Sequence, residues 1–221
     1  MPSPTLNHHQ TSNSQNQNGG PPEPCHEVAF LGPVGTFTHE ASLQRFGGPK
    51  FILKPYPDIR TAIYSLLAKD QDQDQTSSAH QTWASVVPIR NSTAGPVIET
   101  EEVLAEAEVA RQIHRLDDQI VLKIEHCLVR RKQEEDEQLS LGRNYQLVAS
   151  HTQALQQCDQ YLRKHYPNIR RQETSSTAQA ARLVTDDPTG RTLAICSPVC
   201  ASIFDSLEIL DTKIQDASAG E

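Results

Sequence analysis

Long apolar runs, paired cysteines and positive charge are all scarce in this sequence. No stretch reaches the roughly 18 apolar residues that a membrane-spanning helix needs, and the N-terminus shows no apolar core of a signal peptide. The five cysteines form no Cys-x-x-Cys pair and are odd in number, so we expect small buried side chains rather than disulfides or metal ligands. We therefore expect a soluble, cytoplasmic protein that does not contact a membrane.

Basic residues are too few and too scattered for a nucleic-acid-binding face. The 20 lysine and arginine residues stand against 28 aspartate and glutamate residues, which gives a net charge of −8. Nucleic-acid binding requires a basic surface that neutralises phosphates. We exclude nucleic acid as a partner and expect any anion to be bound by a local site.

The apolar content of 36% is low for a globular chain, and the shortfall lies in three polar segments. Residues 1–26 are rich in Asn, Gln, Ser, Pro and His, a composition that predicts a disordered tail. Residues 70–78 and 130–137 are polar or charged throughout and are typical of solvated loops. We expect the chemistry to be carried by the remaining chain.

That remaining chain alternates short β-rich runs with helical stretches. The patterns predict strands at 28–31, 83–89, 120–130, 145–149, 168–173, 192–196 and 207–210, and helices at 39–46, 59–68, 96–110, 153–166, 178–184 and 198–206. Strands that alternate with helices indicate an α/β fold with largely parallel sheets. The length suits two lobes with a ligand between them.

Four short polar motifs stand where apolar runs stop, at residues 32–38, 88–95, 150–155 and 176–181. Three of them directly follow a predicted strand, and all four precede a helical stretch. The first turn of such a helix points free amide N–H groups beyond the sheet edge, where a carboxylate or phosphate is favoured. The four motifs therefore predict one anion site.

The order of these motifs resembles the prephenate dehydratase family. The matching segments, which extend over residues 27–216, are Gly32-Pro33-Val34-Gly35-Thr36-Phe37-Thr38, Pro88-Ile89-Arg90-Asn91-Ser92, His126-Cys127-Leu128, Ser150-His151-Thr152-Gln153-Ala154-Leu155, Ser176-Thr177-Ala178-Gln179-Ala180-Ala181 and Ile214-Gln215-Asp216. The resemblance implies a two-lobed α/β module similar to periplasmic binding proteins of the second type, with mostly parallel sheets and a cleft between the lobes. We expect one lobe at about 27–98 plus 193–221 and the other at about 99–192.

The resemblance also implies a function. The family converts prephenate to phenylpyruvate in phenylalanine biosynthesis, as a carbon-oxygen lyase that needs no cofactor and no metal, and its members tend to form homodimers. The implied catalytic residues are Thr36, Asn91, Ser92, Ser150, Gln157, Ser176 and Thr177. The implied substrate-binding or loop-shaping residues are Gly35, Arg90, Gly95, His151 and Gln153. Taken singly, Thr36, Ser150 and Ser176 would also fit as simple helix caps.

Two departures from the family pattern bear on activity. Arg90 stands where the family's central loop has an acid, and the chain follows Ile214-Gln215-Asp216 with five small or polar residues in place of the family's Asn-x-Thr-Arg-Phe segment and its regulatory ACT domain. We therefore expect a C-terminally truncated domain with impaired dehydratase activity. Two alternatives stay open: a non-catalytic module that binds an aromatic carboxylate or amino acid, and an arogenate dehydratase, against which the positive charge of Arg90 argues weakly.

Overall fold

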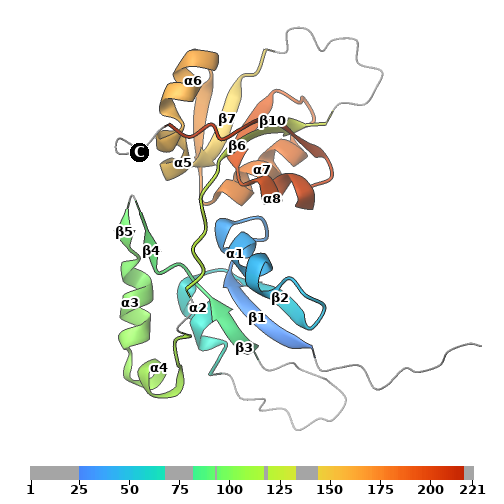
Figure 1. The fold of residues 1–221 in the computed structure, drawn as a ribbon. Helices are drawn as coiled ribbons and strands as arrows, with labels where there is room; N and C mark the ends of the chain where they lie inside the picture. The colour runs from blue at the N-terminus through green and yellow to red at the C-terminus, as the bar shows by residue number, and fades with distance from the viewer. Residues whose placement is uncertain (1–24, 68–81, 93, 117–118, 133–143, 217–221) are drawn as a thin grey trace, which may run out of the picture.

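The computed structural model describes residues 25–67, 82–92, 94–116, 119–132 and 144–216, which form two lobes placed one above the other (Figure 1). Most of the expected tail, all of the loop at 70–78 and the part of the other loop from 133 on lie outside the described residues. Two boundaries differ from expectation. The first strand already begins at His26, and the strand Cys127–Arg131 continues into the expected loop at 130–137. Within that strand, Arg130 Nε donates to Glu208 Oε1 at 2.6 Å.

The first lobe is a three-stranded parallel sheet with helices packed around it. Its elements are β1 (His26–Leu31), α1 (Phe37–Phe46), β2 (Phe51–Tyr56), α2 (Ile59–Tyr64), β3 (Thr82–Val86), β4 (Arg90–Asn91), β5 (Gly95–Pro96), α3 (Ile98–Ala105) and α4 (Ala107–Gln112). The strand order is β2-β1-β3, with both pairings parallel. The central strand carries the apolar run Val28–Phe30, which is fully buried, as expected for a strand covered on both faces.

The second lobe is a five-stranded sheet of order β10-β6-β9-β7-β8. Its elements are β6 (Cys127–Arg131), β7 (Leu147–His151), α5 (Thr152–Gln157), α6 (Asp159–His165), β8 (Arg170–Thr174), α7 (Thr177–Asp186), β9 (Thr192–Cys196), α8 (Pro198–Ile203) and β10 (Leu207–Thr212). Strand β7 pairs in parallel with β8 and β9, whereas β6 runs antiparallel to β9 and β10. The fold is therefore α/β with mostly parallel strands, as predicted.

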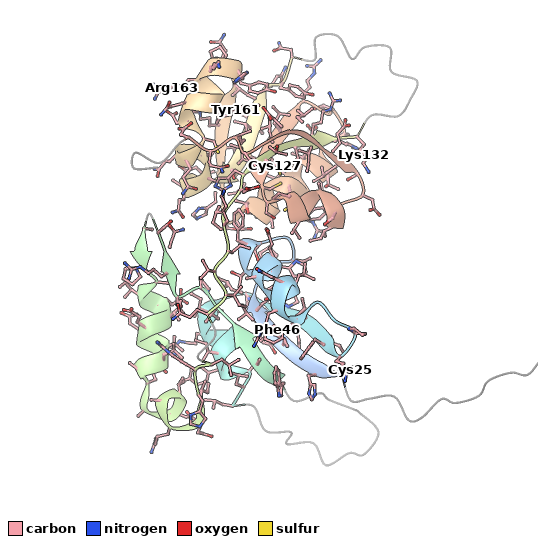
Figure 2. All side chains as sticks on the ribbon, viewed as in Figure 1. Cys25, Phe46, Cys127, Lys132, Tyr161 and Arg163 are labelled. Carbon is pink, nitrogen blue, oxygen red and sulfur yellow. The ribbon has the colours of Figure 1, made fainter. Side chains whose placement is uncertain are left out.

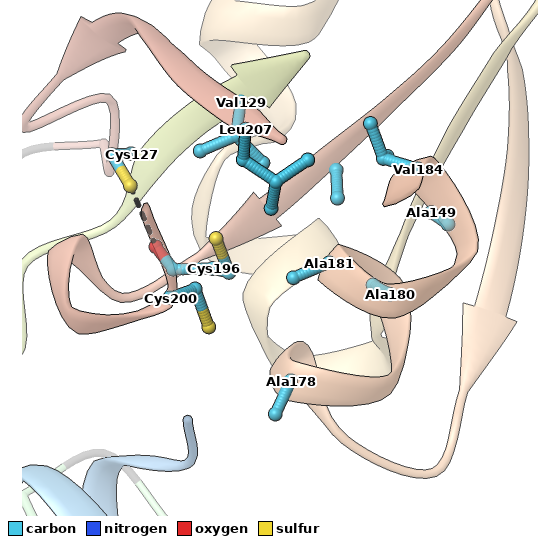
Figure 3. Close-up of a cluster of buried hydrophobic side chains, with 11 residues drawn as sticks. Cys127, Val129, Ala149, Ala178, Ala180, Ala181, Val184, Cys196, Cys200 and Leu207 are labelled. Carbon is cyan, nitrogen blue, oxygen red and sulfur yellow. Dashed lines mark hydrogen bonds between the residues drawn. The ribbon is translucent and has the colours of Figure 1, made fainter. Parts of the chain in front are cut away.

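Both faces of the second sheet are buried, because alternate residues of its strands point to opposite sides. Cys127 and Val129 face α7, whose small side chains Ala178, Ala180 and Ala181 allow a close approach to the sheet (Figure 3). The strand residues that point to the opposite face pack with Leu155 of α5 and Leu162 of α6 in a separate cluster. The sheet thus forms a rigid platform with helices on both sides.

The lobes meet where the loop after β1 reaches α8. The carbonyl oxygen of Gly35 accepts hydrogen bonds from Ser197 Oγ at 3.3 Å and from Cys200 Sγ at 3.2 Å, across 162 and 165 residues of sequence. Gly35 has a φ of 94°. A Cβ atom placed on it would lie 3.1 Å from Cys200 Sγ and 3.3 Å from Ala178 Cβ. Only glycine combines this backbone conformation with so close a contact.

The structure groups the elements into lobes differently from the expected division. Residues 193–216 do not return to the first lobe, because β9 and β10 both pair with β6 in the second sheet. Helices α3 and α4 belong to the first lobe, where Val103 and Val109 pack on Ile59 and Ile63 of α2. The chain passes to the second lobe later than expected, along the extended segment before β6 (Figure 1).

Several predicted elements are interrupted or were missed. The predicted helices at 96–110 and 153–166 are each two helices, because Glu106 takes an extended conformation (φ −61°, ψ 134°) and Cys158 also leaves the helical region. The predicted strand at 120–130 pairs only from Cys127 on. Strand β2 was not predicted, since its Lys54-Pro55 interrupts the apolar pattern and no side chain in it is fully buried.

We predict that Gly35→Ala destabilises the protein by about 1–3 kcal/mol, because the substitution strains a positive φ and pushes a methyl group against Cys200 and Ala178. Urea unfolding followed by circular dichroism measures the change. Gly48→Ala is the matched control, because a Cβ there meets nothing within 4 Å. Equal stability of the two variants would contradict the proposed role of the close contact.

Candidate active site

The first motif forms the turn and the helix start at the junction of the lobes. Thr36 caps α1, since its Oγ1 accepts from His39 N at 3.2 Å while donating to Leu31 O at 3.1 Å. The Gly35 amide donates to His39 Nδ1 at 3.2 Å. Burial lowers the pKa of His39, so its ring stays neutral and accepts this bond. The Thr36 hydroxyl is thus occupied by the local fold.

The fourth motif lies directly against the first. Ser176 caps α7 by accepting from Gln179 N at 3.1 Å, and Thr177 is buried beside it. Ala178 is the residue that approaches the Gly35 turn. The N-termini of the ten-residue helices α1 and α7 therefore lie close together, and the free N–H groups of both first turns favour negative charge.

The third motif is mostly structural. Ser150 is fully buried, and its Oγ donates to the Ile195 carbonyl at 2.6 Å, which links β7 to β9. His151 is exposed and caps α5, with Nδ1 accepting from Gln153 N at 3.3 Å. Neither Ser150 nor Gln153 provides a group at the junction in these contacts. The printed contacts of Ser150 and His151 are thus local to β7, β9 and the start of α5.

Gln157 lies at the end of α5, where the extended segment before β6 enters the second lobe. Its Oε1 is 2.8 Å from His126 Nε2, and its main-chain oxygen accepts from Asp216 N at 2.6 Å. The His126 ring makes an edge contact with Phe37 of the first motif, with centroids 5.5 Å apart. Cys127, which follows His126 in the chain, is labelled in Figure 2. His126 thus connects Phe37 of the first motif with Gln157, which lies two residues after the third motif.

The second motif stands apart from the other three. Its residues form the short hairpin β4–β5, in which Asn91 Oδ1 accepts from Ala94 N at 3.2 Å. A Cβ at Gly95, which has a φ of 83°, would meet nothing within 4 Å. Arg90 and Ser92 are exposed. Figure 1 shows this hairpin projecting from the first lobe towards the level of the second.

Two residues at the junction received no role from the sequence. Ser197 stands at the N-cap position of α8 without a side-chain capping bond, and its hydroxyl interacts with Glu40 of α1. Burial raises the pKa of Glu40, with a further increase from the negative charge of Glu125, although the Ser197 bond opposes it. Glu40 Oε2 is buried without a partner among the described residues. The Ser197-Pro198 pair after a strand was a signal for a helix start.

Burial lowers the pKa of His126, and the hydrogen bond with Gln157 only partly offsets this effect. The ring is 3% exposed, and its Nδ1 is buried with no partner in the described part of the chain. Desolvation disfavours the imidazolium ion, so the neutral ring predominates at neutral pH. The junction therefore contains a neutral imidazole and a carboxyl group of raised pKa.

Two cavities in the described residues lie away from this junction. One, of about 570 Å³, borders Leu66, Trp83 and Ile113 in the first lobe. The other, of about 380 Å³, lies over α5 and α6, where Asp159 pairs with Arg163 at 2.7 Å and with Arg171 at 2.5 Å. Neither coincides with the expected cleft between the lobes.

None of the helices in the described ranges is long and apolar enough to cross a membrane. Within the same ranges, no group of three or more His, Cys, Asp or Glu side chains could hold a metal ion. Cys127, Cys158, Cys196 and Cys200 are buried free thiols, as predicted, whereas Cys25 is a free thiol that is only half-buried.

Comparisons with known proteins agree with the order of the motifs. The family model for prephenate dehydratase matches residues 28–220. A bifunctional chorismate mutase/prephenate dehydratase of Neisseria gonorrhoeae is 31% identical over 189 residues, with 86% of this chain and 46% of the relative covered. A prephenate dehydratase of Bacillus subtilis is 28% identical over 192 residues, with 86% and 59% covered. The chain thus spans about half the length of these curated relatives.

A solved structure supports the fold. The prephenate dehydratase of Arthrobacter aurescens in complex with L-Phe superposes with a TM-score of 0.65 at 28% identity, covering 86% of this chain and 56% of that one. The match extends over both lobes. Among the functions that the sequence left open, these comparisons favour the dehydratase.

We predict that Ser150→Ala lowers the free energy of unfolding by about 1–3 kcal/mol, because the buried Ile195 carbonyl loses its donor. Ser92→Ala, at an exposed hairpin position, should change it by less than about 0.5 kcal/mol. Chemical denaturation of both variants measures the difference. If the two serines proved equally dispensable, the structural assignment of Ser150 would be wrong.

We predict that His126 makes stability depend on pH. The unfolded chain takes up a proton at about the ordinary pKa of 6.5, whereas the folded chain does so only at lower pH. Stability from this group is therefore complete above about pH 6.5 and falls as the pH drops below it. His39 acts in the same direction, and Glu40, with its raised pKa, acts in the opposite one.

The contribution of His126 is isolated by comparing variants. Thermal unfolding between pH 7.5 and 5.5 should show a shallower decline for His126→Gln than for the unsubstituted chain. His114→Gln, at an exposed position, should leave the slope as it is. Parallel slopes for all three proteins would contradict the assignment.

Proposed function

The chain belongs to the prephenate dehydratase family, and from this premise we propose that it converts prephenate to phenylpyruvate in phenylalanine biosynthesis. The single observation that carries the proposal is the family match over residues 28–220. The names of the relatives agree with it. Because those relatives are about twice as long as the matched region, the activity is proposed for the domain that this chain contains.

The reaction is a carbon-oxygen lyase reaction that needs no cofactor. The ring C–O bond breaks as the departing hydroxyl gains a proton and leaves as water. The bond to the ring carboxylate breaks with it, and its electron pair completes the aromatic ring while carbon dioxide leaves. A site for this reaction must hold two carboxylates, place a donor at the hydroxyl and exclude water.

The paired N-termini of α1 and α7 support a carboxylate site at the lobe junction. Their capping residues Thr36 and Ser176 are occupied by the helices themselves, so the first-turn amides are the groups available to an anion. Gln157 adds a side-chain amide near the start of α1, which it reaches through His126 and Phe37. In this proposal Thr36, Ser150 and Ser176 are supporting residues rather than catalytic ones.

The hairpin supplies a second set of groups. Arg90, Asn91 and Ser92 project from the first lobe, and the guanidinium of Arg90 suits a substrate carboxylate. Thr177 is the first residue of α7 and is buried, so we assign it to the packing of that helix rather than to the ligand. We assign the hairpin to substrate binding and the α1–α7 junction to the carboxylate of the reacting ring.

We also propose how the chain is divided into lobes, the compartment in which it acts and its assembly. The two lobes comprise residues 26–113 and 119–216, a division that follows the observed sheets. Free buried thiols support a reducing compartment, and we propose the cytoplasm. The family resemblance supports a homodimer as the assembly, with prephenate as the small-molecule partner.

We predict that the purified 221-residue chain releases phenylpyruvate from prephenate, measured by absorbance in alkali against a blank without protein. Gln157→Leu should lower kcat/KM by about 10²-fold, because one oriented donor is lost. Gln156→Leu, one residue earlier on the exposed face of α5, is the matched control and should retain activity. Folded protein that produces no phenylpyruvate above the blank would refute the proposed function.

A further inference from the structure

One buried imidazole at the junction has no role in the function proposed above. His126 directly precedes β6 and is 3% exposed. Its Nε2 lies 2.8 Å from Gln157 Oε1, and its Nδ1 has no partner among the described residues. A buried ring with one nitrogen bound to a neighbouring amide and the other unpaired calls for an explanation.

The contacts determine which tautomer is present. Because Gln157 Oε1 can only accept, Nε2 must carry the proton and Nδ1 keeps its lone pair. Phe37 from α1 and Gln157 from α5 both contact the ring, and neither is charged. The main chain of His126 is also held, since His126 N donates to Gln215 Oε1 at 3.0 Å and His126 O accepts from Ile214 N at 3.1 Å.

The same contacts determine the orientation of Gln157. Its main-chain oxygen accepts from Asp216 N at 2.6 Å, and the Asp216 carboxylate accepts from Gln160 N at 3.0 Å and from Tyr161 N at 3.3 Å. The end of α5 is thus fixed against the segment after β10. With Oε1 turned to His126, the amide nitrogen of the half-buried Gln157 donates to no described residue.

We propose that His126 is a positioning residue that fixes the Gln157 amide with its NH₂ group presented to the substrate. The inference rests on the proposed function, since it concerns the same site. A flipped amide would present a carbonyl oxygen, which repels substrate oxygens. The fixed orientation therefore selects a carboxylate or carbonyl oxygen as the group bound at Gln157, a selection that the side chain alone would not make.

The arrangement is tested first without substrate, by nitrogen-15 NMR of the 221-residue chain. The His126 ring should be the neutral Nε2–H tautomer at pH 7, and the Gln157 side-chain amide should be rigid. In His126→Leu the Gln157 amide should become mobile, whereas His126→Gln, whose amide nitrogen replaces Nε2 as donor, should keep it rigid. An Nδ1–H tautomer, or an amide equally rigid in His126→Leu, would overturn the inference.

The consequence for recognition is tested by titrating prephenate, with bound fraction measured by calorimetry. His126→Leu should weaken binding about tenfold, and His126→Gln should restore it to within about threefold. Combining His126→Leu with Gln157→Leu should cost no more than Gln157→Leu alone, because both changes remove the same oriented donor. Independent losses that multiply, or wild-type affinity in His126→Leu, would refute the positioning role.

The two proposals fail in different ways. If the unsubstituted chain neither binds nor converts prephenate, the proposed function fails, and the tautomer and amide mobility still decide whether His126 positions Gln157. If the chain converts prephenate but Gln157→Leu binds it as tightly as the unsubstituted chain, the function stands and the positioning inference falls. Thermal unfolding of each variant checks that it is folded, and His126→Gln keeps the test valid should His126→Leu be unstable.

Discussion

The close contact at Gly35 is the constraint on which the rest of the site depends. Its carbonyl oxygen is held by Ser197 and Cys200 of the other lobe, and its α-carbon leaves no room for a side chain. This contact brings the first turn of α1 to the first turn of α7. The paired positive helix ends, and with them any preference for a carboxylate at this position, follow from the close approach of two backbones.

Around this contact, polar side chains of the junction are buried away from water. His126 is kept neutral, the Glu40 carboxyl has a raised pKa, and both have one atom without a described partner. Unpaired buried polar atoms lower stability, and such sites are where function tends to lie. The apolar clusters on both faces of the second sheet supply the stability that tolerates them.

The sequence predicted the fold class and most strands, because apolar runs such as Val28–Phe30 are buried on both sides and carry a clear pattern. It missed β2, where a proline and a lysine interrupt that pattern, and it placed β9 and β10 in the wrong sheet. Strand partners depend on long-range pairing, which local patterns do not encode. The sequence also located the four polar motifs. It could not show whether Ser150 faces a ligand or a neighbouring strand, because that depends on where Ile195 lies.

We place substrate binding at the lobe junction, between the first turns of α1 and α7 and with Gln157 reaching α1 through His126. The most direct test is a prephenate titration of the 221-residue chain followed by amide resonances in proton–nitrogen correlation spectra. The account predicts the largest shifts at Phe37, Thr38, Ala178 and the Gln157 side chain. Shifts confined to the cavity beside Leu66 and Trp83, with the junction unchanged, would contradict it.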